Sequence, residues 1–184
     1  RLAEAVEVWN KDLTASGGDF RVQEKLEDAQ LLQMRQQLAV AEKRATTKGD
    51  EESQALAGQM REQYHRKELE IYSARSDRHP DNVQLKFELG VRLKRVGNFA
   101  EAEQTLMEVR KHPKLKAAAT FEVGECLQQQ KKYSNALQFY ARTVELLAND
   151  GDVNLKKQAL YRAGTLAMGL KTYEPAETFF PTLS

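Results

Sequence analysis

A three-residue signature recurs in the second half of this chain. In each copy a glycine is followed nine positions later by an aromatic residue, and alanine follows three positions after that. The copies are Gly90–Phe99–Ala102, Gly124–Tyr133–Ala136 and Gly164–Tyr173–Ala176. The second copy follows the first by 34 residues, and the third follows the second by 40. A period of about 34 residues is typical of stacked helix-turn-helix repeats, so an all-α fold of antiparallel helix pairs is predicted.

The region from 81 to 184 is expected to hold three such pairs, occupying about 83–116, 117–150 and 157–184. Turns of only two or three residues inside each pair favour antiparallel partners. The six predicted helices are 83–96 with 99–111, 115–130 with 133–148, and 155–170 with 173–183.

The N-terminal part is predicted to contain three more helices. Residues 1–18 hold a short helix, which we interpret as the second half of a partial repeat. Residues 19–80 hold two long helices, at 20–47 and 51–78, and the short turn between them should fold them into a long antiparallel hairpin. Apolar positions at coiled-coil spacing mark its first helix, namely Leu31, Met34, Leu38, Ala41 and Ala45. The hairpin is either an elongated, degenerate repeat or a projecting arm that dimerises or docks a partner.

Residues 83 to 184 resemble the tetratricopeptide repeat (TPR) family. The matching motifs are Leu89-Gly90-x2-Leu93 with Ala102-x3-Leu106 and Pro113, then Val123-Gly124-x2-Leu127 with Ala136-x3-Tyr140, then Ala163-Gly164-x2-Ala167 with Ala176-x3-Phe180. Lys86, Thr120 and Leu160 stand where the family has tryptophan, each followed by an aromatic residue. The resemblance implies a right-handed superhelical solenoid.

The same resemblance implies that the first helix of each pair lines a concave groove, which receives an extended peptide or a partner helix. The implied groove residues are Gln84, Phe87, Val91, Lys94, Phe121, Glu125, Gln128, Tyr161, Arg162, Thr165 and Met168. Phe87, Phe121 and Tyr161 form an aromatic row, a residue type that often dominates binding energy. Some family members bind a C-terminal carboxylate with a clamp of lysine, asparagine and arginine. The asparagine positions hold Val91, Glu125 and Thr165 here, so no such clamp is expected.

Small and large residues of the repeat have complementary packing roles. Glycine and alanine are expected to let paired helices approach closely. The turn aromatics (Phe99, Tyr133 and Tyr173) are expected to fill the wedge where each pair diverges. Leu106, Tyr140 and Phe180 are expected to pack onto the next pair.

The charge balance and hydropathy of the chain limit the kinds of partner that it is expected to bind. The chain has 28 Lys and Arg against 27 Asp and Glu, so its net charge of +1 predicts no nucleic-acid partner. No apolar run approaches the roughly 18 residues of a membrane-spanning helix, so no membrane contact is expected.

The single cysteine, Cys126, is expected to pack in a helix. A reducing compartment fits it, as would a secreted domain without disulfides, and we expect a cytoplasmic location.

No arrangement of side chains predicts catalysis, a cofactor or a metal site. Glu62 and His65 have the spacing used in di-iron helical bundles, but such a site needs a second histidine on a helix. Phosphate-binding loops, cysteine pairs and nucleophile-histidine-acid arrangements are missing from the sequence. The chain is therefore predicted not to be an enzyme.

Two functions remain. The first is a non-catalytic protein-protein interaction scaffold or adaptor, which binds a peptide or helix in the groove. The second is a structural module that self-associates through the 20–78 hairpin. The chain starts at Arg1 and stops within a helical pattern at Ser184, so it is expected to be a fragment, and a targeting or membrane segment outside it is compatible with both functions.

Overall fold

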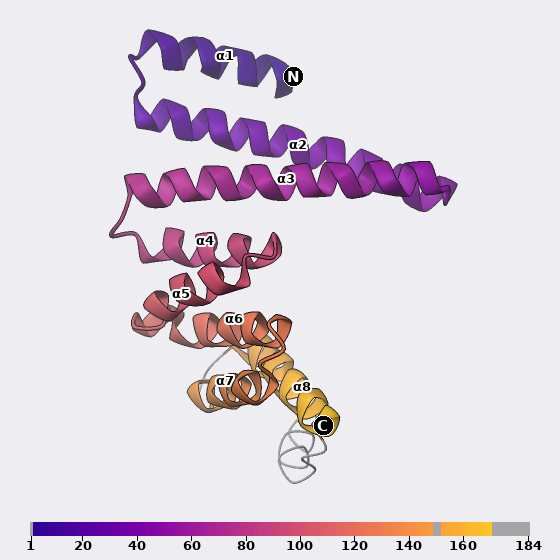
Figure 1. Cartoon of the computed structure of the whole chain (residues 1–184). Coiled ribbons are helices and arrows are strands. Elements are labelled where there is room, and N and C mark those ends of the chain that lie inside the picture. Colours follow the sequence, from indigo (N-terminus) through magenta and orange to yellow (C-terminus); the bar gives the residue numbers. More distant parts are fainter. Residues whose placement is uncertain (1, 149–151, 171–184) are drawn as a thin grey trace. The chain divides into compact units, whose positions relative to one another are not determined.

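The computed structural model describes residues 2–148 and 152–170, and all of its regular structure there is helical. The helices pack in consecutive pairs (Figure 1), which confirms the predicted all-α class. The expected helix at 173–183 lies outside the described residues, together with Tyr173, Ala176 and Phe180. In chain order the elements are α1 (Leu2–Ala15), α2 (Phe20–Lys48), α3 (Glu51–Arg78), α4 (Val83–Arg95), α5 (Phe99–Val109), the 3-10 helix η1 (Pro113–Leu115), α6 (Lys116–Gln129), α7 (Tyr133–Leu146) and α8 (Val153–Gly169).

Local signals account for the ends of these helices. The side chain of Asp19 accepts a hydrogen bond from the Arg21 amide and caps α2. Gly49 ends α2 in the left-handed conformation, with φ of 68°, where a side chain would be strained. Asn82 caps α4 by accepting a 3.1 Å bond from the amide of Leu85.

The chain divides into two compact units, residues 1–71 and 72–184. The division falls inside α3, before the boundary expected after residue 80. Tyr72, the first residue of the second unit, explains this position because the guanidinium of Arg92 on α4 lies 3.6 Å from the centre of its ring. The last turns of α3 therefore belong with the helix pairs that follow.

The first unit is a helical hairpin with α1 packed along α2. The seam of α2 and α3 buries small and apolar side chains, including Leu38, Ala41, Ser53 and Ala57. Both long helices extend beyond the N-terminal side of α1 (Figure 1). In this outer part of the unit, the hairpin has a single narrow seam as its core.

In the second unit, a glycine in the first helix of a pair leaves room for one large side chain from the second helix. A Cβ atom on Gly90 would lie 2.6 Å from Cγ of Leu106, and one on Gly124 would lie 2.8 Å from Cε1 of Tyr140. Leu106 and Tyr140 are both fully buried. We call each of these arrangements a glycine notch, because the space above the glycine is filled by a side chain instead of by a closer helix backbone.

The notches correct two packing expectations. Tyr140 contacts its own pair, where its ring centre lies 5.6 Å from that of Phe121, so packing onto the next pair does not describe its main contacts. Tyr133 is 40% exposed and fills little of the wedge expected for it, whereas Phe99 is half-buried. The alanines of the signature behave as expected, since Ala102 and Ala136 are fully buried.

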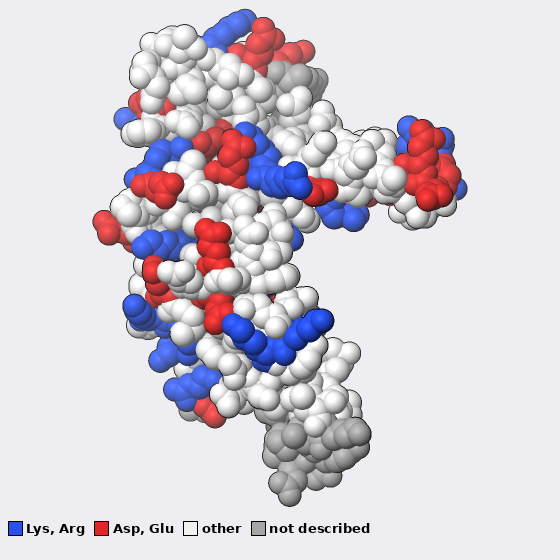
Figure 2. All heavy atoms as spheres, viewed as in Figure 1, with Lys and Arg blue, Asp and Glu red and all other residues white. Residues whose placement is uncertain are grey.

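Charged side chains of both signs are interspersed over the face of the molecule drawn in Figure 2, and neither sign dominates it. Among the described residues, none of the helices combines the length and the apolar character that a membrane crossing requires.

Candidate functional site

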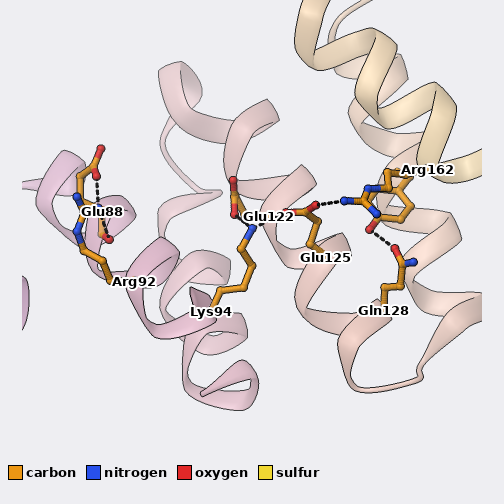
Figure 3. Close-up of polar contacts among 8 residues, drawn as sticks. Glu88, Arg92, Lys94, Glu122, Glu125, Gln128 and Arg162 are labelled. Carbon is orange, nitrogen blue, oxygen red and sulfur yellow. Dashed lines mark hydrogen bonds and ion pairs between the residues drawn. The ribbon is translucent and has the colours of Figure 1, made fainter. Parts of the chain in front are cut away.

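Four charged side chains from three helices form one ion-pair network in the second unit (Figure 3). The ammonium of Lys94 on α4 lies between two carboxylates of α6, 2.5 Å from Glu122 and in contact with Glu125. Glu125 also accepts a 3.1 Å hydrogen bond from Arg162 on α8. We call Lys94, Glu122, Glu125 and Arg162 the charge network.

The repeat itself brings these residues together. Lys94 and Gln128 occupy equivalent positions in the first and second copies of the repeat, and Glu122 and Arg162 do so in the second and third. Side chains three residues apart on a helix share a face, so α6 presents Glu122 and Glu125 on the same side. Stacking then sets basic side chains of α4 and α8 on either side of the acidic pair of α6.

The charge network is largely buried. The side chains of Lys94, Glu122 and Glu125 are 19%, 19% and 20% exposed, whereas Arg162 is 46% exposed. Burial alone would lower the pKa of Lys94, but the charge of Glu122 and hydrogen bonds to both carboxylates outweigh it, and this pKa is raised. Burial also raises the pKa of Glu122, an effect that Lys94 only partly offsets. Lys94 therefore stays charged at neutral pH and holds α4 against α6.

A neutral hydrogen bond extends the charge network along α6. The hydroxyl of Tyr140 donates to Oε1 of Gln128 at 2.6 Å, which orients the side chain of Gln128 next to Glu125 (Figure 3). This bond takes one lone pair of the amide oxygen and leaves the amino group as a donor for a ligand.

Beside the charge network lies a hollow of about 350 Å³. Its lining residues are Lys94, Phe99, Glu125, Gln128, Gln129 and Arg162. Two cations, one anion and two amides thus border the same space, together with Phe99. These groups supply hydrogen-bond donors and acceptors.

Four of the residues expected in the groove are brought together at this hollow, namely Lys94, Glu125, Gln128 and Arg162. The remaining expected positions lie elsewhere on the first helices. Gln84, Tyr161, Thr165 and Met168 are exposed, and Phe87 and Val91 are half-buried. Phe121 is only 4% exposed and packs on Tyr140, so its ring offers little surface to a partner.

The site residues expected from the sequence do not include Glu122, Gln129 or Phe99. Glu122 carried a usable signal, because it is equivalent to Arg162 in the repeat and lies three positions before Glu125. Gln129 and Phe99 carried none, since their place at the hollow depends on how the end of α6 meets the start of α5.

In the described part of the chain, no group of three or more His, Cys, Asp or Glu side chains is arranged to hold a metal ion. Glu62 forms an ion pair of 2.5 Å with Arg66.

Comparisons of the chain with models of known protein families and with curated proteins find no significant match.

Proposed function

We propose that this chain is a non-catalytic protein-binding module of the TPR type, and that the face formed by α4, α6 and α8 binds a peptide or helix of another protein. The observation that carries the proposal is the meeting of Lys94, Glu125 and Arg162, from three successive first helices, at one hollow. In a stacked array, the first helices line the surface that is shared by all repeats.

The chemistry of this surface favours a polar partner segment over a purely apolar one. Arg162 is about half exposed and the structure shows a single ion pair for it, so its guanidinium retains donors for a carboxylate or a main-chain carbonyl. Gln129 is exposed, and the oriented amide of Gln128 adds further donors. Tyr161, which precedes Arg162 in the chain and is 59% exposed, supplies an aromatic surface of α8 outside the hollow.

The proposal is tested by selecting peptides from a random library displayed on phage, with the whole chain as bait. The affinity of each selected peptide is then measured for a site variant, Tyr161→Ala with Arg162→Ala. The matched control is Tyr133→Ala with Arg142→Ala on α7. It removes the same two residue types, which are also exposed, and Arg142 likewise has one ion pair.

We expect the site variant to bind the selected peptides at least about tenfold more weakly, because two exposed contacts of roughly 0.7 kcal/mol each amount to this factor. The control variant should bind them like the native chain, provided that circular dichroism shows both variants to be equally helical. Peptides that bind the site variant and the native chain equally would remove this face as the binding site. A library that yields no binding peptide would count against the proposed function itself.

A further inference from the structure

An apolar groove runs along one side of the α2–α3 hairpin, in the part where both helices continue past α1. It has a volume of about 620 Å³. Its lining residues are Gln36, Gln37, Val40, Ala41, Arg44, Leu56 and Met60. Val40 is 70% exposed and Leu56 is 42% exposed, although both are apolar. In Figure 2 the charged side chains gather at the tip of the hairpin, and the stretch beside the tip is largely uncharged.

The other side of the same helix pair has a different character. There Arg61 reaches across from α3 and forms a double hydrogen bond, at 3.0 and 2.7 Å, with one carboxylate oxygen of Glu42 on α2. A hollow of about 520 Å³ lies on this side too, but the ion pair and polar side chains such as Gln54 border it. The apolar groove therefore differs from the general surface of the hairpin.

A stripe along α3 borders the apolar groove and reads Glu52, Leu56, Met60, Gln63 and Lys67. Steps of four, four, three and four residues keep these side chains within about 80° of the helix circumference. The stripe begins with an acid, ends with a base and has its two apolar residues between them. Glu52 and Lys67 lie roughly 22 Å apart along the axis, at about 1.5 Å per residue.

We propose that this groove is the interface with a second copy of the same chain, whose hairpin packs antiparallel to the first. In a two-fold arrangement centred between Gln59 and Met60, each Glu52 faces Lys67 of the other copy at both ends of the interface. Met60 then lies beside its own equivalent at the axis, and each Leu56 covers Gln63 of the other copy. The apolar surface of the groove, which includes Val40, is thereby removed from water.

The charges select this orientation. A parallel arrangement would set Glu52 against its own equivalent and Lys67 against its own, and like charges at close range disfavour a complex. Arg44, the one charged residue that lines the groove, would also meet its equivalent in a parallel pair. In the antiparallel pair the two copies of Arg44 lie on opposite sides of the two-fold axis. The resulting four-helix packing is an established way to bury hairpin faces of this kind.

The first test is sedimentation equilibrium of the full chain up to about 100 µM, a concentration at which even a weak specific dimer is populated. We expect a monomer-dimer equilibrium, and we expect Val40→Glu with Leu56→Glu to leave a monomer. Both positions are exposed in the single chain, so circular dichroism should show unchanged helix content. A chain that stays monomeric overturns the proposal, and so does a dimer that is indifferent to these substitutions.

The second test uses charge reversal and needs no apolar substitution. Glu52→Lys and Lys67→Glu should each weaken self-association about tenfold, because each creates like-charge contacts at both ends. An equimolar mixture of the two variants should form a heterodimer about as tightly as the native dimer, since both ends are again paired. The double variant E52K/K67E should recover as well.

Glu62→Lys serves as the control for these reversals. Lys67→Glu breaks the 2.7 Å ion pair of Lys67 with Glu70 within α3, and Glu62→Lys likewise breaks the ion pair with Arg66. Glu62 lies off the stripe, so self-association should not change. A mixture of the E52K and K67E variants that associates no better than either variant alone would exclude the antiparallel register.

Discussion

The hydroxyl of Tyr140 on α7 donates a 2.6 Å hydrogen bond to the side-chain oxygen of Gln128 on α6. The ring that carries this hydroxyl is fully buried over Gly124, while Gln128 lines the hollow at the surface. One side chain thus joins the core of a helix pair to its proposed binding face.

Tyr140→Phe keeps the ring and removes this bond. Gln128 is half-buried and water can reach its amide, so we expect a loss of only about 0.5–1.5 kcal/mol in the free energy of unfolding. Chemical denaturation measures it, with the more exposed Tyr133→Phe as control, for which a change within about 0.5 kcal/mol is expected. Equal effects of the two substitutions would mean that the bond contributes nothing to stability.

Gly124→Ala tests the glycine notch. The added Cβ would lie 2.8 Å from Cε1 of the buried Tyr140, so we expect the unfolding free energy to fall by about 1–3 kcal/mol despite the better helix propensity of alanine. Gly58→Ala in α3 is the matched control, because a Cβ there would have nothing within 4 Å of it. That change should stabilise its helix by about 0.5–1 kcal/mol. If both substitutions stabilise, the notch is not tightly filled.

Lys131→Gly is expected to stabilise the turn between α6 and α7. Lys131 has a φ of 61°, in the left-handed region, and its equivalent in the preceding repeat is Gly97, with a φ of 90°. Relief of this strain should raise the unfolding free energy by up to about 1 kcal/mol. Thermal unfolding should show a higher Tm for Lys131→Gly and a lower Tm for Gly97→Ala.

Cys126 is expected to resist thiol reagents while the chain is folded. Burial raises the pKa of its thiol from 9.0 to about 12, which lowers the thiolate fraction at pH 8 by about a thousandfold. The unfolded thiol loses its proton near pH 9 and the folded thiol keeps it, so stability from this group declines as pH rises from 9.0 to about 12. Labelling with a chromogenic disulfide at pH 8, with and without denaturant, measures the difference. Rapid labelling of the folded chain contradicts the expectation.

The helices could be predicted from the sequence because their signals are local. Asp19, Gly49 and Asn82 end or begin helices through bonds to residues two to four positions away, and the glycine-aromatic-alanine spacing sets the pairs. Such signals need no knowledge of tertiary structure.

Side-chain partners across helices were harder to predict. Phe121 was expected to face a partner because of its place in the repeat, yet its ring lies against Tyr140 on the next helix. Likewise, the pairing of Glu125 with both Lys94 and Arg162 depends on the distance between stacked helices, which a period in the sequence does not contain. The types of residue at the site could therefore be predicted from the sequence more readily than the contacts between their side chains.

The charge network has a consequence for how a partner would be recognised. Its two cations and two anions sum to zero, and Glu125 already serves as counter-charge to Arg162. A carboxylate that binds the remaining donors of Arg162 would meet a cation that Glu125 already neutralises, and few dissolved ions would be released. Association at this face should therefore have a shallow dependence on salt concentration, unlike the steep dependence of proteins that neutralise a polyanion.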